Sequence, residues 1–60
     1  MAKIEIDYVP HEFVEDAVLA KIWVDDRIVE EFAGETEHDC RWHCFIWLKA
    51  NNFDEEDFPA

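Results

Sequence analysis

Basic residues are scarce in this chain, and their scarcity excludes several classes of partner. The 60 residues include five Lys and Arg against sixteen Asp and Glu, which leaves a formal net charge of −11 at pH 7. A field of this sign repels phosphate backbones and anionic lipids, and nucleic-acid binding depends on contacts from Lys and Arg to phosphates. We therefore expect no direct binding to nucleic acid and no binding to a membrane.

Long apolar runs are also missing. No segment approaches the roughly 20 apolar residues of a membrane-spanning helix. The first ten residues, MAKIEIDYVP, contain one lysine and none of the apolar stretch of a secretory signal. Two cysteines in such a chain are typical of a reducing compartment. These features predict a protein of the cytoplasm.

The chain is nevertheless rich in hydrophobic side chains. Half of its residues are hydrophobic, and three Trp, one Tyr and five Phe are among them. A chain of this length is near the lower limit for folding without disulfides or metal. This supply of apolar groups makes a core feasible, and the aromatic content argues against disorder. We expect one domain spanning residues 1–60.

Two segments have the pattern of strands. Between residues 3 and 9 apolar and charged side chains alternate, which is typical of a half-buried strand, and Pro10 ends it. In residues 17–33, AVLAKIWVDDRIVEEFA, two apolar runs flank Asp25 and Asp26. This predicts a β-hairpin that ends at Gly34, because Asp tolerates the positive φ of a type I′ turn. The alternative is a helix from Pro10 through Trp23 with Pro in its first turn.

The region that follows has the signals of a helix. Thr36 suits an N-cap and Lys49 suits the last turn, so we predict a helix over about residues 36–51. Its predicted core face consists of Cys40, His43, Cys44, Trp47 and Leu48. The fold class that follows is α+β, with a small three-stranded antiparallel sheet (hairpin at 17–33) packed by this C-terminal helix.

The same helix holds the groups that could bind zinc. His38, Cys40, His43 and Cys44 lie close together, but zinc sites usually draw two pairs of ligands from separate segments, and on a helix His38 points away from the others. Cβ geometry is unfavourable for a disulfide between the two cysteines. We interpret them as small buried side chains and predict no metal, no cofactor and no catalytic residue. A chain this short leaves little room for a substrate pocket beside its core.

Carboxylates form clusters along the whole chain. On a strand, residues i and i+2 lie about 6.6–6.8 Å apart. Glu5 and Asp7 can therefore present two charges at a spacing similar to that of neighbouring phosphates on one nucleic-acid strand. The hairpin tip and the acidic run near the C-terminus would extend that array. The partner-binding residues that we predict are Glu5, Asp7, Asp25, Asp26, Glu30, Glu31, Asp54, Glu55, Glu56 and Asp57.

With these clusters and this charge, the chain resembles small acidic proteins encoded by bacteriophages and other mobile elements. Anti-CRISPR proteins are the nearest analogue in size and charge, and the resemblance rests on Glu5/Asp7, Asp25/Asp26, Glu30/Glu31 and 54-DEED-57. Many such proteins mimic nucleic acid. The resemblance implies an inhibitor in a host bacterial cell, with its carboxylates in the Lys- and Arg-lined groove of a DNA-binding effector such as a Cascade-type surveillance complex.

An alternative function is a non-enzymatic interaction module, such as an antitoxin, an assembly factor or a domain from a halophile. The acidic residues would then be spread evenly over the surface. A patch around Trp42, Ile46 and Phe53 would form a dimer. We favour a monomer over a dimer, and the nucleic-acid mimic over this alternative.

Overall fold

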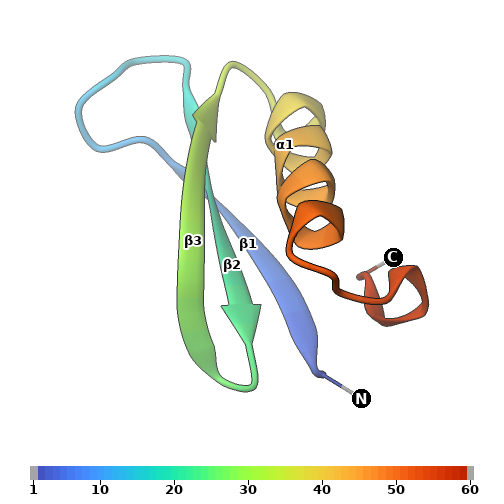
Figure 1. Ribbon diagram of the computed structural model, residues 1–60. Coiled ribbons are helices and arrows are strands. Elements are labelled where there is room, and N and C mark those ends of the chain that lie inside the picture. The colour runs from blue at the N-terminus through green and yellow to red at the C-terminus, as the bar shows by residue number, and fades with distance from the viewer. Residues whose placement is uncertain (1, 60) are drawn as a thin grey trace.

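Residues 2–59, which a computed structural model describes, form three strands followed by helical segments (Figure 1). The strands are β1 (Ile4–Pro10), β2 (Val18–Val24) and β3 (Arg27–Gly34), and they precede α1 (Glu37–Ala50) and the short 3-10 helix η1 (Glu55–Asp57). The sheet is antiparallel in the order β1-β2-β3. The predicted α+β class, hairpin and C-terminal helix are confirmed. The alternative helix through residues 10–23 is wrong, because residues 18–24 pair in the sheet.

A tight turn joins β2 to β3. Its central residues, Asp25 and Asp26, have φ values of 50° and 69°, the left-handed conformation that a type I′ turn requires. Close to the turn the register shifts: Trp23 pairs with Ile28, whereas Ile22 pairs with Glu30. Val29 is therefore the extra residue of a β-bulge.

The bulge decides which side chains of β3 face the helix. Residues directly opposite each other in an antiparallel pair share one face of the sheet. Because Ala20 is fully buried and pairs with Phe32, the bulge turns Phe32 toward the core and Glu31 away from it. Without the extra residue, Phe32 would lie on the open face.

The core lies between the sheet and α1. Ile4, Ala20 and Ile22 contribute to it from the sheet, and Cys40, Cys44 and Leu48 contribute from one stripe of the helix at i, i+4 and i+8. The last five of these residues are 0% exposed. His43, predicted on the same face, is exposed, and its ring stacks on Phe32 at the margin of the core, with 6.1 Å between ring centroids.

The ends of α1 have identifiable causes. The Thr36 hydroxyl oxygen accepts a hydrogen bond from the Asp39 N–H at 3.1 Å, as expected of an N-cap. At the other end the Phe53 N–H donates to the Leu48 carbonyl at 3.0 Å, and the chain turns back along the helix. The Phe58 ring then packs on Phe45, with 5.3 Å between centroids. Among the described residues, no helix has both the length and the apolar character needed to cross a membrane.

Candidate functional site

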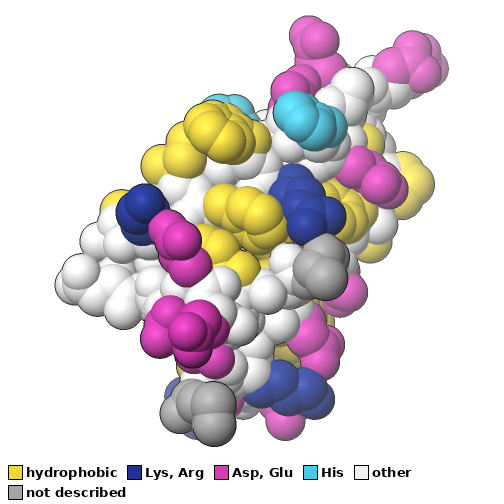
Figure 2. Space-filling view, turned by 90° about the vertical axis from the view of Figure 1, so that its right-hand side faces the viewer, with side chains coloured by type: hydrophobic (Ala, Val, Ile, Leu, Met, Phe, Trp, Pro, Cys, Tyr) yellow, Lys and Arg dark blue, Asp and Glu magenta, His cyan; other side chains and the backbone are white. Residues whose placement is uncertain are grey.

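The carboxylates are almost all exposed. Of the sixteen, only Glu30 and Asp57 are half-buried. Among residues 2–59, ion pairs join Lys3 to Glu5 and Asp26, and Lys49 to Glu55. On the face seen in Figure 2, acidic side chains lie at the top, along the right edge and in the lower part, and hydrophobic and basic side chains lie near the centre. Local pairing therefore leaves most of the negative charge directed at solvent.

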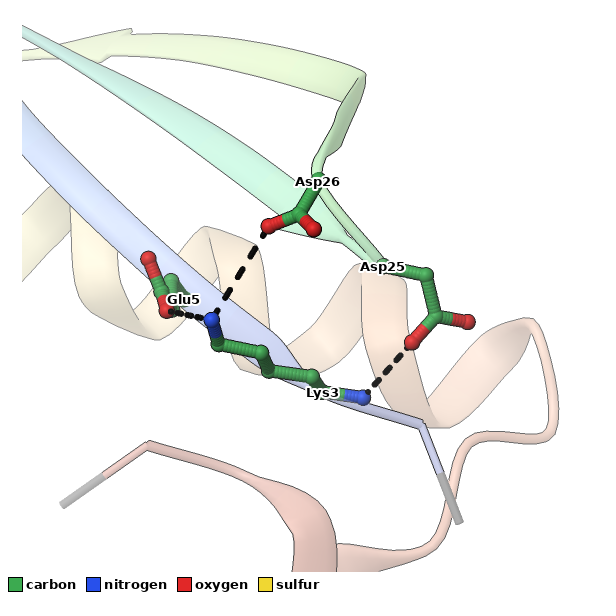
Figure 3. Close-up of polar contacts among 4 residues, drawn as sticks. All are labelled: Lys3, Glu5, Asp25 and Asp26. Atoms are coloured by element: carbon green, nitrogen blue, oxygen red, sulfur yellow. Dashed lines mark hydrogen bonds and ion pairs between the residues drawn. The ribbon is translucent and has the colours of Figure 1, made fainter.

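One group of predicted site residues gathers around Lys3 (Figure 3). The Lys3 Nζ lies 3.2 Å from Glu5 Oε1 and 3.8 Å from Asp26 Oδ1. The backbone N–H of Lys3 donates to Asp25 Oδ1 at 3.0 Å. The hydrogen bond to Glu5, followed by the charges of Glu5 and Asp26, raises the pKa of Lys3. We call Lys3, Glu5, Asp25 and Asp26 the Lys3 cluster. It places two carboxylates beside the Lys3 ammonium group and a third beside the Lys3 backbone N–H.

The face of the sheet that turns away from α1 carries two more predicted residues. Asp7 and Glu31 lie opposite Lys21 on either side, so one lysine sits in the row between two carboxylates. In the next row Trp23 lies between Glu5 and Ile28. The Trp23 indole N–H is buried without a hydrogen-bond partner among the described residues. This open face is acidic at its edges and aromatic near its centre.

The remaining predicted residues lie elsewhere. Glu30 pairs with the buried Ile22 and so shares the helix side of the sheet, whereas Glu31 faces away. Beyond α1, Asp54 Oδ1 accepts a hydrogen bond from the Glu56 N–H at 3.0 Å, and Glu55 pairs with Lys49 at 3.0 Å. The ten predicted residues therefore occupy the Lys3 cluster, the open face, the helix side of β3 and the segment after α1, and they do not share one face.

Six further carboxylates lie at the opposite end of the molecule. They belong to the β1–β2 loop, the β3–α1 connection and the first turn of α1, which lie at the end of the sheet far from the hairpin turn (Figure 1). All six are exposed: Glu12, Glu15, Asp16, Glu35, Glu37 and Asp39. The predicted set omits them. Antiparallel connectivity is the signal that could have found them, because it brings these two connections to the same end.

We call these six the loop end. The hairpin end comprises the Lys3 cluster together with residues 54–57, since α1 runs back toward the hairpin turn (Figure 1). The principal extents of the molecule are 36 × 20 × 18 Å. Negative charge is thus concentrated toward both ends of an elongated shape.

Both thiols are buried, and no cysteine is paired in a disulfide among the described residues. Burial raises the pKa of Cys44 to about 11 and also raises the pKa of Cys40, so both thiols stay protonated at neutral pH. His11 Nδ1 accepts hydrogen bonds from the N–H groups of Phe13 and Val14, each at 3.1 Å. Within residues 2–59, no three His, Cys, Asp or Glu side chains converge in a way that could hold a metal ion.

The outer face of α1 carries an apolar groove of about 500 Å³. Trp42 is 63% exposed and Ile46 is 50% exposed. The groove is lined by Trp42, Phe45, Ile46, Lys49, Glu55, Phe58 and Pro59. Phe53, which the sequence assigned to a patch with Trp42 and Ile46, is instead half-buried and stacks on Trp47, with 6.1 Å between centroids. That assignment is wrong because the turn after α1 folds Phe53 back against the core.

Comparison with known proteins identifies no relative. No protein-family model matches the chain, and searches of curated proteins and of solved structures give no significant match.

Proposed function

We propose that this chain is an acidic nucleic-acid mimic that binds the basic DNA-binding surface of a host defence or DNA-processing complex. The observation that carries the proposal is the exposure of fourteen of sixteen carboxylates on a chain with five Lys and Arg. In this proposal the protein is not an enzyme. It acts as a monomer in the cytoplasm of a bacterial host.

The placement of the acidic groups supports the same proposal. The longest extent of the molecule is 36 Å, which is close to one helical turn of B-DNA, about 34–36 Å. A groove that holds DNA presents cations along such a length. The loop end and the hairpin end would engage cations at two places about one turn apart, as phosphates on one side of a duplex do.

The Lys3 cluster supports it through pre-organisation. Its carboxylates are held by hydrogen bonds and ion pairs at 3.0, 3.2 and 3.8 Å. Groups that are already ordered lose less conformational entropy when they bind Arg side chains. A surface of this charge also speeds encounter with a basic partner, and this acceleration falls with salt.

Competition with DNA tests the proposal. A purified Cascade-type surveillance complex is incubated with its labelled target duplex, and the protein is added at low and at high salt. We expect the protein to lower DNA occupancy, added duplex to restore it, and high salt to weaken the effect. Absence of competition for this complex and for other DNA-binding effectors of the host would refute the proposal.

A charge variant sharpens this test. Neutralising Asp25, Asp26, Glu30 and Glu31 with Asn and Gln keeps side-chain shape and, at the turn, a residue type that tolerates positive φ. We expect inhibition to weaken strongly. The matched control is Val29→Ala on the same strand, which removes exposed apolar atoms and no charge. Full inhibition by the neutralised variant would contradict mimicry.

A second candidate function is a module that dimerises through the groove on α1. The exposure of Trp42 and Ile46 favours it. Two copies would bring together two charges of −11, and this repulsion opposes a dimer. Analytical ultracentrifugation decides the matter: a dimer that Ile46→Ala dissociates would favour the second candidate.

A further inference from the structure

The groove on α1 is a built feature of the fold. Trp42 and Ile46 are one turn apart on the helix and form one side, and the ring of Phe58 forms the other. Exposed aromatic groups that border a concave apolar surface are typical of interaction sites. The volume of about 500 Å³ is within the range of binding pockets and accommodates a large side chain.

Two contacts hold the far wall in place. The Phe58 ring packs on Phe45, with 5.3 Å between centroids, and Arg41 Nη2 donates to the Pro59 carbonyl at 3.5 Å. The Arg41 guanidinium also lies 5.0 Å from the centroid of the Phe45 ring. The groove is therefore formed before any partner arrives.

The charges around the groove select its occupant. Arg41 and Lys49, the two cations of α1 near the groove, already have partners within the chain. Glu55 lines the groove and belongs to the acidic run 54–57, and Asp39 lies one turn before Trp42 on the helix. A second copy would bring its own charge of −11 to an acidic border. A positively charged segment complements this border.

We propose that the groove binds a basic segment of the partner protein and seats one aromatic or large aliphatic side chain beside Trp42 and Phe58. Lys or Arg residues on either side of this anchor contact Glu55 and Asp39. The Lys49–Glu55 pair is exposed, with side chains 74% and 65% accessible, so a partner cation can compete for Glu55 at little cost. This proposal rests on the proposed function, which supplies the basic partner. It adds an apolar anchor that fixes the orientation in which the two proteins bind.

Three synthetic peptides test it. The first is rich in Lys and Arg with a central Leu, the second replaces that Leu with Ala, and the third replaces the basic residues with Glu. Binding is followed by the indole N–H signals of the ¹⁵N-labelled protein, and the Trp42 signal is identified by its loss in Trp42→Phe. We expect the first peptide to shift the Trp42 signal and not that of Trp23. The Ala peptide should bind roughly tenfold more weakly, and the Glu peptide should not bind.

The chain offers a matched pair of variants. Ile46 borders the groove and is 50% exposed, and Ile28 lies on the open face of the sheet and is 45% exposed. Ile46→Ala should lower the affinity for the Leu peptide about tenfold, whereas Ile28→Ala should leave that affinity unchanged. Both side chains are exposed, so both variants should keep the unfolding temperature of the parent chain.

The outcomes separate this inference from the proposed function. Equal affinities for the Leu and Ala peptides, or equal effects of the two Ile variants, would overturn the inference that the groove binds an apolar anchor. Charge-based competition with DNA would remain intact. If the protein binds the peptide in an anchor-dependent way but fails to compete with DNA, the groove is a binding site and the nucleic-acid mimicry is refuted. A Trp42 signal that shifts with the concentration of the chain alone, together with a dimer that Ile46→Ala dissociates, would assign the groove to a second copy and overturn the basic occupant.

Discussion

The carboxylate of Asp25 accepts a hydrogen bond from the backbone N–H of Lys3, and the backbone N–H of Asp25 donates to the carbonyl of Lys3, each at 3.0 Å. The turn between β2 and β3 is thereby tied to the residue that precedes β1. Asp25, which its charge predicts to be a partner contact, thus also stabilises the fold. Neutralising it and removing it are different experiments.

We expect Asp25→Ala to lower the free energy of unfolding by about 1–2 kcal/mol. The substitution removes the hydrogen bond to Lys3 and places an Ala at a φ of 50°. Asp25→Asn keeps an acceptor oxygen and tolerates this φ, so it should cost less than half as much. Urea denaturation followed by circular dichroism measures both. Equal losses for the two variants would mean that the hydrogen bond and the turn conformation contribute nothing.

The contact between Gly34 and Cys40 gives a second prediction. A Cβ at position 34 would lie 3.0 Å from Cys40 Sγ. That sulfur is fully buried and lies 3.4 Å from the Val18 carbonyl oxygen and 3.8 Å from that of Phe32, so moving it aside would disturb these two contacts. We expect Gly34→Ala to destabilise the fold by about 1–3 kcal/mol.

A double-mutant cycle isolates this contact. Cys40→Ala removes the sulfur that the new methyl group would meet, so Gly34→Ala should cost much less in that background. Thermal unfolding of the four proteins measures the coupling. Additive effects of the two substitutions would contradict a steric cause.

Alkaline pH should destabilise the protein through its buried thiols. Burial raises the pKa of Cys44 from its ordinary value of 9.0 to about 11. The folded state therefore holds the proton more tightly than the unfolded state, and the stability that this provides below pH 9 is lost as the pH rises toward 11. The pKa values of Cys40, Tyr8 and Lys3 are raised as well and act in the same direction.

Cys44→Ala separates the contribution of this thiol from the others. We expect the variant to lose less unfolding free energy than the parent chain over the same alkaline range, whatever its stability at neutral pH. In the parent chain, a thiol reagent at mildly alkaline pH should react only as fast as the protein unfolds. Rapid reaction of folded protein would show that the two cysteines are accessible.

The sequence predicts the strands and the helix of this fold better than it predicts which side chains lie on which face of them. Alternation in residues 3–9, the Asp25-Asp26 turn and the Thr36 cap are local signals, and local sterics and hydrogen bonds produce the strands and the helix that they predict. The bulge at Val29 depends instead on a balance of free energies. Burial of the Phe32 side chain in the core stabilises the fold, and the extra residue disrupts the hydrogen bonds between β2 and β3. The local sequence around Val29 does not reveal this balance.

The same reason explains the outcome for the candidate site. Charge clusters are visible in the sequence, but the bulge decides that Glu31 faces away from α1 and that Glu30 lies on the helix side of the sheet. Phe53 leaves the predicted patch because the turn at Asn52, with a φ of 65°, directs the chain back toward the core. The loop end needs the antiparallel topology before its two connections can be seen to meet. Tertiary pairing, rather than composition, decides which carboxylates lie close together.

The two acidic ends give the last prediction, which concerns how the protein engages its partner. Neutralising Glu12, Glu15 and Glu35 with Gln weakens the loop end, and neutralising Glu5, Asp26 and Glu56 with Gln and Asn weakens the hairpin end. The six side chains are exposed, so each triple variant should stay within about 1 kcal/mol of the parent stability. If both ends contact one basic groove, each variant should lose on the order of tenfold in affinity at low salt, since exposed charge pairs contribute at most about 1 kcal/mol each.

Salt distinguishes a two-ended contact from a single one. Screening shortens the reach of exposed charges to about 10 Å at 0.1 M ionic strength, so the losses caused by the two triple variants should shrink together as salt is raised. Titrations of the partner complex at several salt concentrations measure this for the parent chain and both variants. If the loop-end variant binds like the parent at every salt concentration, the partner contacts only the hairpin end. The match between the 36 Å length of the molecule and one turn of DNA would then have no part in binding.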